Sequence, residues 1–168
     1  MKEAVINLVT GMPPELAVFL LSALPVTEMR ASLPLAITVF HLPPVTATVI
    51  CLLGNLLPIP ILLTLLPAAI RALHRWGPAW VQRLITRYFD YLKRKHADRF
   101  EKVGAAALGA VTLLPLPGAG VWTGCLLAVL FQIRPRFSVP ALVAGAVAEA
   151  VVILLIVQGT LAGLSFLL

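Results

Sequence analysis

Two charged residues lie in the middle of an apolar stretch near the start of this 168-residue chain. Glu28 and Arg30 are two residues apart in the sequence LPVTEMRASLP, with Pro25 and Pro34 on either side. A third charge, Glu149, lies in the apolar sequence VAGAVAEAVV towards the other end. A carboxylate can carry a proton, and a guanidinium can bind a carboxylate or phosphate through two parallel hydrogen bonds. These three residues are therefore the first candidates for chemistry.

The composition indicates the solvent in which these charges lie. Hydrophobic residues make up 60% of the chain, charged residues 12%, and the mean hydropathy is +1.00. A soluble domain contains about 25% charged residues. The composition therefore predicts a single integral membrane domain over residues 1–168. A charge at the centre of a bilayer costs about 2.5–3.5 kcal/mol, so we expect the three charges to face a cavity or one another.

Four apolar blocks divide the chain, at about residues 15–42, 43–70, 103–132 and 137–168. The first block is interrupted by the prolines around the charged pair, and the third by the sequence LLPLPGAG. No straight helix tolerates proline and glycine at this density. Each remaining piece of about ten residues would be about 15 Å long as a helix, half of the hydrocarbon core. We therefore expect two re-entrant hairpins that turn at mid-membrane, with two kinked full spans as the alternative.

Residues 71–102, between the second and third blocks, are strongly basic. They hold nine of the thirteen Lys and Arg residues, with aromatic and aliphatic residues at helical spacing among them. This pattern predicts a basic amphipathic linker helix on the cytoplasmic surface of the membrane. A solvated loop is the alternative. Basic charge alone is weak evidence for nucleic-acid binding, and we expect no nucleic-acid partner.

Residues 1–70 and 103–168 show the same order of segments, a broken hairpin followed by one long apolar segment. If residues 71–102 are cytoplasmic, a re-entrant third block returns Arg134 and Arg136 to the cytoplasmic side, as the positive-inside rule prefers. The halves then have opposite orientations and form an inverted repeat, whose broken helices meet at the midplane. The predicted fold is therefore an all-α integral membrane fold, an inverted repeat of two re-entrant helical hairpins, each followed by a long transmembrane segment.

The breaks also supply backbone groups for a ligand. The second helix of each hairpin is expected to begin at mid-depth, near Ser32–Pro34 and near Gly120, with its N–H groups and positive dipole end exposed. Ser32 is the expected N-cap of the first of these helices. The expected proton carriers are Glu28 and Glu149. The expected substrate-binding residues come from both breaks and from the second apolar block: Arg30, Glu28, Ser32, Asn55, Gly118, Gly120 and Thr123.

Glu28 and Arg30 share a face if the first break is extended, because alternate residues of a strand point the same way. They would then face a substrate together. The alternative is a structural role in which the two charges only neutralise each other.

Three stretches carry a resemblance to a known family: PVTEMRASLPLAI at 25–37, GNLLPIPILL at 54–63 and LPLPGAGVWTGCLLAVL at 114–130. Together they resemble the small multidrug export family of bacteria and archaea, over nearly the whole chain. The arrangement resembles, more distantly, the DedA-type proteins, whose paired re-entrant hairpins are linked to transmembrane movement of lipid phosphates. The first resemblance implies export of amphipathic drugs, and the second implies movement of a polyprenyl-phosphate lipid.

The predicted function is that of an ion-coupled secondary transporter or exporter, a multi-pass protein of the inner (plasma) membrane and not an enzyme. The chain has no ATPase phosphate-binding loop and no nucleophile–base set, so we expect an ion gradient or the substrate's own gradient to supply the energy. Arg30 and the helix N-termini favour a small amphipathic substrate with an anionic or phosphate-bearing head group. A lipid-phosphate flippase is one alternative, and a channel or non-transporting scaffold is another.

The remaining expectations concern cofactors and assembly. Cys51 and Cys125 lie in apolar stretches without a further ligand at metal spacing, so we expect no metal and no cofactor. Half-length hairpins leave backbone groups that cost several kcal/mol each if they face lipid unpaired. A two-fold homodimer is the simplest cover for them. The expected partners are membrane lipid, a small amphipathic substrate and a second copy of the chain.

Overall fold

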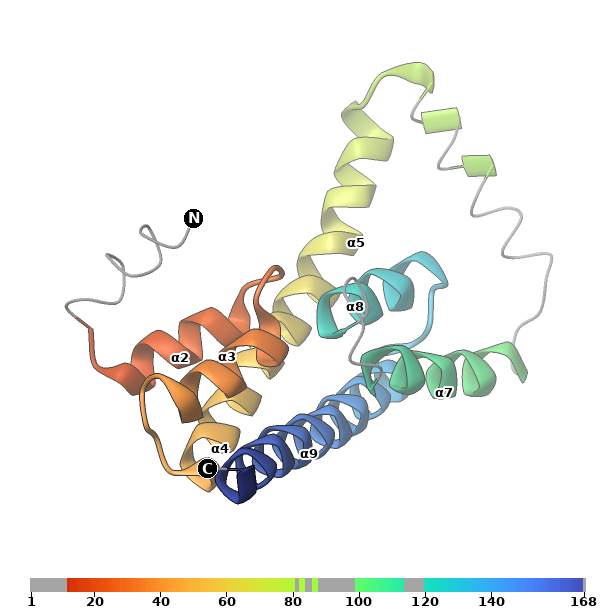
Figure 1. The fold of residues 1–168 in the computed structure, drawn as a ribbon. Coiled ribbons are helices and arrows are strands. Elements are labelled where there is room, and N and C mark those ends of the chain that lie inside the picture. The colour runs from red at the N-terminus through yellow and green to blue at the C-terminus, as the bar shows by residue number, and fades with distance from the viewer. Residues whose placement is uncertain (1–11, 81, 84–85, 88–98, 114–119, 168) are drawn as a thin grey trace.

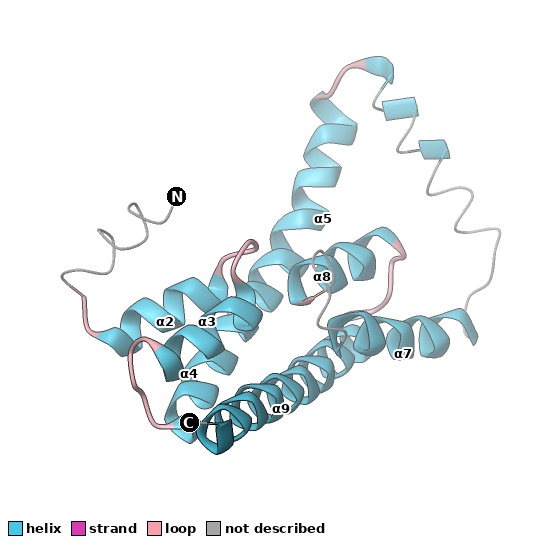
Figure 2. Cartoon of the chain, in the orientation of Figure 1, coloured by secondary structure: helices cyan, strands magenta, loops and turns pink. Residues whose placement is uncertain are grey.

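The computed structural model describes residues 12–80, 82–83, 86–87, 99–113 and 120–167. Every regular element in these residues is a helix (Figures 1 and 2), which confirms the all-helical prediction for this part of the chain. The elements are α2 (Pro14–Ala23), α3 (Glu28–Thr38), α4 (Pro44–Leu56), α5 (Pro58–Trp76), α7 (Arg99–Leu113), α8 (Val121–Leu130) and α9 (Pro135–Leu167).

Two helical segments are long and apolar enough to cross a membrane. The first joins α4 and α5 over 33 residues, and the second is the Pro135–Thr160 part of α9, 26 residues long. The first is interrupted at Leu57, whose N–H donates to the Gly54 carbonyl three residues back, at 3.3 Å. Pro58 has no N–H to offer that carbonyl, so the regular four-residue ladder cannot continue here.

The first predicted break lies between α2 and α3. These helices have 10 and 11 residues, which matches the expected half-length pieces. The Thr27 hydroxyl donates to the Leu21 carbonyl and joins the turn to the end of α2. The second break falls between Leu113 and Val121, and residues 114–119, with Gly118 among them, lie outside the described residues.

The order short helix, short helix, long helix occurs twice along the chain (Figure 1). In the first half, α4 crosses α2 at Gly54. A Cβ added to Gly54 would lie 2.3 Å from the Phe19 carbonyl oxygen and 3.0 Å from Cβ of Ser22. The Ser22 hydroxyl also donates to the carbonyl of Cys51, one turn earlier on α4. Only a glycine allows this close approach.

The second half repeats this crossing. A Cβ added to Gly145 of α9 would lie 2.7 Å from the Gly109 carbonyl oxygen and 2.7 Å from Cβ of Thr112, both on α7. In each half the glycine of the long helix therefore meets two residues three apart on the first short helix. The second of the two is a buried hydroxyl residue in both halves.

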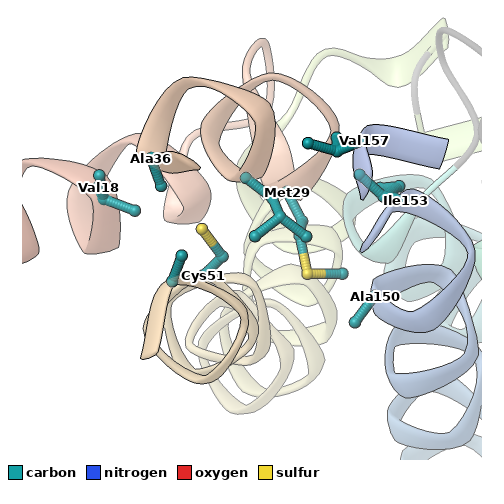
Figure 3. Close-up of a cluster of buried hydrophobic side chains, with 9 residues drawn as sticks. Val18, Met29, Ala36, Cys51, Ala150, Ile153 and Val157 are labelled. Carbon is teal, nitrogen blue, oxygen red and sulfur yellow. The ribbon is translucent and has the colours of Figure 1, made fainter. Parts of the chain in front are cut away.

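Two apolar clusters form the core. The first draws on α2, α3, α4 and the later part of α9 (Figure 3): Val18, Met29, Leu33, Ala36, Ala47, Cys51, Ala150, Ile153 and Val157. The second draws mainly on α5, α7, α8 and the earlier part of α9: Ile59, Leu108, Val121, Cys125, Ala128, Ile133, Leu142 and Ala146. The α4–α5 segment and α9 contribute to these clusters in opposite order along the chain. The two long segments therefore run in opposite directions (Figure 1).

The basic stretch 71–102 overlaps both neighbouring helices. Its first residues belong to α5, which ends at Trp76, and its last belong to α7, which begins at Arg99. Residues 88–98 lie outside the described residues. The amphipathic linker helix therefore stays a prediction.

Candidate functional site

The three charges singled out in the sequence lie together, although they come from opposite ends of the chain. Arg30 Nε donates to Oε1 of Glu149 at 2.7 Å, and Arg30 Nη2 lies 3.6 Å from Oε2 of Glu28. The Glu149 side chain is fully buried, and those of Glu28 and Arg30 are 9% and 18% exposed. We call these three residues the charge cluster. One guanidinium serves two carboxylates, so the cluster has a formal charge of −1 when both acids are ionised.

The Glu28 carboxylate lies at the N-terminus of α8. A Cβ added to Gly120, the N-cap of α8, would be 2.2 Å from Oε2 of Glu28. The backbone N–H of Trp122 also lies near the same carboxylate. The first N–H groups of a helix have no intrahelical acceptor and form the positive end of its dipole. Glu28 therefore caps a helix that belongs to the other half of the chain.

Trp122 makes the return contact. Its indole Nε1 donates to the carbonyl of Ala23 at 3.2 Å. Ala23 is the last residue of α2, and the last carbonyls of a helix have no intrahelical donor. Each broken hairpin therefore caps a helix of the other, Glu28 at the start of α8 and Trp122 at the end of α2. The hydrogen bond of Trp122 to α2 was not predicted from the sequence, and the available signal was an aromatic donor directly after the second break.

The backbone of Glu28 is in an uncommon conformation. Its φ is 43°, in the left-handed region that residues other than glycine rarely adopt. Such strain persists where surrounding contacts over-determine it, and it is concentrated at functional sites. At Glu28 the surrounding contacts are those to Arg30, Gly120 and the Trp122 backbone.

Two expectations about the first break are wrong. Helix α3 begins at Glu28 with Thr27 at its N-cap, so Ser32 lies inside the helix and is not the cap. The Ser32 hydroxyl instead donates to the Glu28 carbonyl at 2.7 Å and contacts the Cys51 sulfur at 3.6 Å. Glu28 and Arg30 therefore lie in the first turn of a helix and not on an extended strand. Glu, Met, Arg and Ala form helices readily, which favours the earlier start.

Asn55 and Glu149 lie where the two apolar clusters meet. Asn55 is one turn after Cys51 of the first cluster and one turn before Ile59 of the second. Glu149 lies at the corresponding boundary on α9. Among the described residues, both amide atoms of Asn55 and Oε2 of Glu149 are buried without a hydrogen-bond partner. Buried polar atoms nearly always have a partner, so this boundary is a polar layer that can accept a further donor.

The predicted site residues are therefore only partly brought together. The structure joins Glu28 and Arg30 with Glu149 and Gly120. The start of α8 at Val121, directly after Gly120, is as expected. Thr123 is half-buried in the first turn of α8, and Gly118 lies outside the described part of the chain.

The residues of this site lie within a stretch that matches a known family. A family model described as "Putative small multi-drug export protein" matches residues 28–152, which begin at Glu28 and extend past Glu149. The chain belongs to this family. No curated protein and no solved structure matches the chain.

The family description is that of an exporter and not of an enzyme. Together with the two long apolar helices, it identifies this chain as a membrane protein. None of these comparisons shows the likeness to DedA-type proteins, which stays a prediction.

Proposed function

We propose that this protein is an ion-coupled secondary exporter of the inner membrane, and that the charge cluster is its coupling site. The observation that carries the proposal is the part-buried ion pair between Arg30 of the first half and the fully buried Glu149 of the second, at 2.7 Å. Ionisable residues inside a membrane usually mark a transport pathway. A proton on Glu149 would change the cluster's formal charge from −1 to zero and weaken an ion pair that joins the halves.

The proposed transport path uses an inverted repeat of two re-entrant hairpins. The matching glycine crossings and the opposite directions of the long helices support it. A third observation is that Arg71 of α5 and Arg134 after α8 line the same cavity. Both arginines would mark the cytoplasmic face under the positive-inside rule. The two-fold homodimer stays a prediction.

The charge of the cluster bears on the substrate. The sequence predicts an anionic head group, because Arg30 and a helix N-terminus would both face a ligand. In the structure the Glu28 carboxylate occupies the N-terminus of α8, and Arg30 contacts two carboxylates. The excess negative charge therefore favours a cationic amphipath, which would compete with a proton for Glu149. Such competition would couple inward proton movement to outward movement of the substrate.

An anionic amphipath, including a lipid phosphate moved by a flippase, is the second candidate. The guanidinium of Arg30 favours it, because this group binds phosphate and carboxylate through two parallel hydrogen bonds. The anion would have to replace a carboxylate at Arg30, and it would therefore bind together with a proton. The two candidates thus predict opposite responses to the same pH gradient.

Flux in proteoliposomes distinguishes these candidates. A fluorescent cationic amphipath and an anionic one of the same ring system are compared under an imposed pH gradient. We expect the wild type to move the cation against the proton flow. Glu149→Gln, compared at an equal amount of inserted protein, should remove the pH dependence of this flux. Glu15→Gln changes an exposed acid at the start of α2 and should leave flux unchanged. Faster anion movement along the proton flow would support the second candidate, and no pH-driven flux of either would favour a channel or scaffold.

A further inference from the structure

A second site lies between α5 and the connection from α8 to α9. A cavity of about 400 Å³ is present there, distinct from the charge cluster. Its polar lining comes from Arg71 on one side and from Gln132 and Arg134 on the other. Its remaining walls are largely apolar and include Leu63, Ile70 and Ile133.

The charged residues among the described lining of this cavity are both arginines. Arg71 and Arg134 both line the cavity, together with the amide residue Gln132. No acidic residue is among the described residues that line it. A guanidinium is planar and presents its N–H groups in a fork that matches a phosphate, so two of them favour a phosphate over a point anion.

The two arginines also lie at the same distance from the polar layer. Arg71 is 16 residues after Asn55, and Arg134 is 15 residues before Glu149. These separations correspond to about 24 and 22 Å along a helix. The proposed function places the polar layer at mid-membrane, and the hydrocarbon core extends about 15 Å from there. Both arginines therefore lie beyond the edge of the hydrocarbon core, even if the helices are tilted. Leu63 lies between these levels, at the depth of the acyl chains.

We propose that this cavity binds the phosphate head group of an anionic phospholipid from the cytoplasmic leaflet. Arg71 and Arg134 bind the phosphate, and an acyl chain lies along Leu63 and Ile70. A free phosphate ion would use the same guanidinium groups but would have no use for the apolar walls. A leaflet lipid, in contrast, reaches the cavity without leaving the membrane. The bound lipid joins α5 to the start of α9 whatever substrate the protein moves.

Lipid titration of the purified, delipidated protein tests this site. Native mass spectrometry measures binding of phosphatidylglycerol, with phosphatidylcholine as the zwitterionic comparison and inorganic phosphate as the free-ion arm. We expect Arg71→Gln and Arg134→Gln each to weaken phosphatidylglycerol binding about tenfold or more, because each removes charge-assisted hydrogen bonds. Arg75→Gln is the matched control, because it removes the same charge one turn further along α5. In this control, only the general attraction between a basic side chain and anionic lipid is lost, and phosphatidylglycerol binding should weaken by at most about fivefold.

A further variant separates the lipid from the free ion. Ile70→Trp leaves both arginines in place and narrows the space along the apolar wall of the cavity. Tryptophan is well tolerated at the membrane interface. It should weaken phosphatidylglycerol binding and leave phosphate binding unchanged. Thermal unfolding without lipid shows that each variant is folded. Equal losses for Arg71→Gln and Arg75→Gln, or inorganic phosphate binding as tightly as the lipid, would overturn the proposal.

Discussion

The carboxylate of Glu28 lies so close to Gly120 that a Cβ there would be 2.2 Å from Oε2 and 2.8 Å from Oε1. This contact places the side chain of one broken hairpin against the backbone of the other. Gly120 also has φ 152°, a conformation that side chains disfavour. The meeting point of the two halves therefore requires a glycine for two independent reasons.

Gly120→Ala should destabilise the protein by about 2 kcal/mol or more, since the new methyl group meets the carboxylate and the backbone is strained. Thermal unfolding in detergent measures the loss. Gly159→Ala on α9 is the matched control, because nothing lies within 4 Å of its added Cβ. The control should be neutral or stabilising by up to about 1 kcal/mol. Equal melting temperatures for the two variants would contradict the contact.

The sequence predicted this meeting point only in outline. The density of prolines around Glu28 located the first break, and the cost of buried charge predicted that Arg30 would find a partner. The partner itself, Glu149, is 119 residues away, so only the tertiary fold brings the two together. The exact start of α3 was also missed, because the capping preference of Ser32 competes with contacts that the sequence does not show. The hydrogen bond from Trp122 to the end of α2 was not predicted for the same reason.

Trp122→Phe should lower stability by about 1 kcal/mol. Phenylalanine keeps most of the aromatic volume but removes the indole N–H that donates to the Ala23 carbonyl at 3.2 Å. Trp80→Phe is the control, since Trp80 is 67% exposed. Thermal unfolding of both variants in the same detergent gives the comparison. A loss that is no larger for Trp122→Phe than for the control would show that the hydrogen bond contributes nothing.

The ion pair between Arg30 and Glu149 should be strongly coupled. Arg30→Gln leaves two buried carboxylates without their guanidinium and should cost about 3–5 kcal/mol. Arg30→Gln combined with Glu149→Gln removes both partners and should cost clearly less than the single change to Arg30. A double-mutant cycle measured by thermal unfolding should give a coupling energy of at least about 1 kcal/mol. Glu15→Gln with Arg75→Gln, both exposed, should be additive.

The repeated crossings predict similar effects of a methyl group in the two halves. Gly54→Ala would place Cβ 2.3 Å from the Phe19 carbonyl oxygen, and Gly145→Ala 2.7 Å from the Gly109 carbonyl oxygen. Backbone atoms cannot move aside as a side chain does, so each change should cost about 1–3 kcal/mol. Gly109→Ala is the control. Its Cβ would lie 3.3 Å from the nearest atom, so its loss of stability should be smaller. A loss at Gly109 as large as at the other two would contradict the repeat of close crossings.

The last prediction concerns the sides of the membrane on which the two hairpins end. His41 and Gln132 have φ 51° and 54°, and each lies three residues before the proline that begins a long helix. They would be equivalent positions of the proposed repeat. If the repeat is inverted, the turn at His41 lies outside the cell, and the turn at Gln132, followed by Arg136, lies in the cytoplasm.

Single cysteines at His41 and Arg136 test this arrangement in a background that lacks the two native thiols, Cys51 and Cys125. Both introduced positions are exposed, so each thiol is open to a membrane-impermeant reagent. His41→Cys should react in intact cells, and Arg136→Cys should react only after the membrane is permeabilised. The second condition is also the control that shows Arg136→Cys to be reactive. Labelling of both positions from outside would mean that the third apolar block crosses the membrane fully, and the re-entrant model of that block would be wrong.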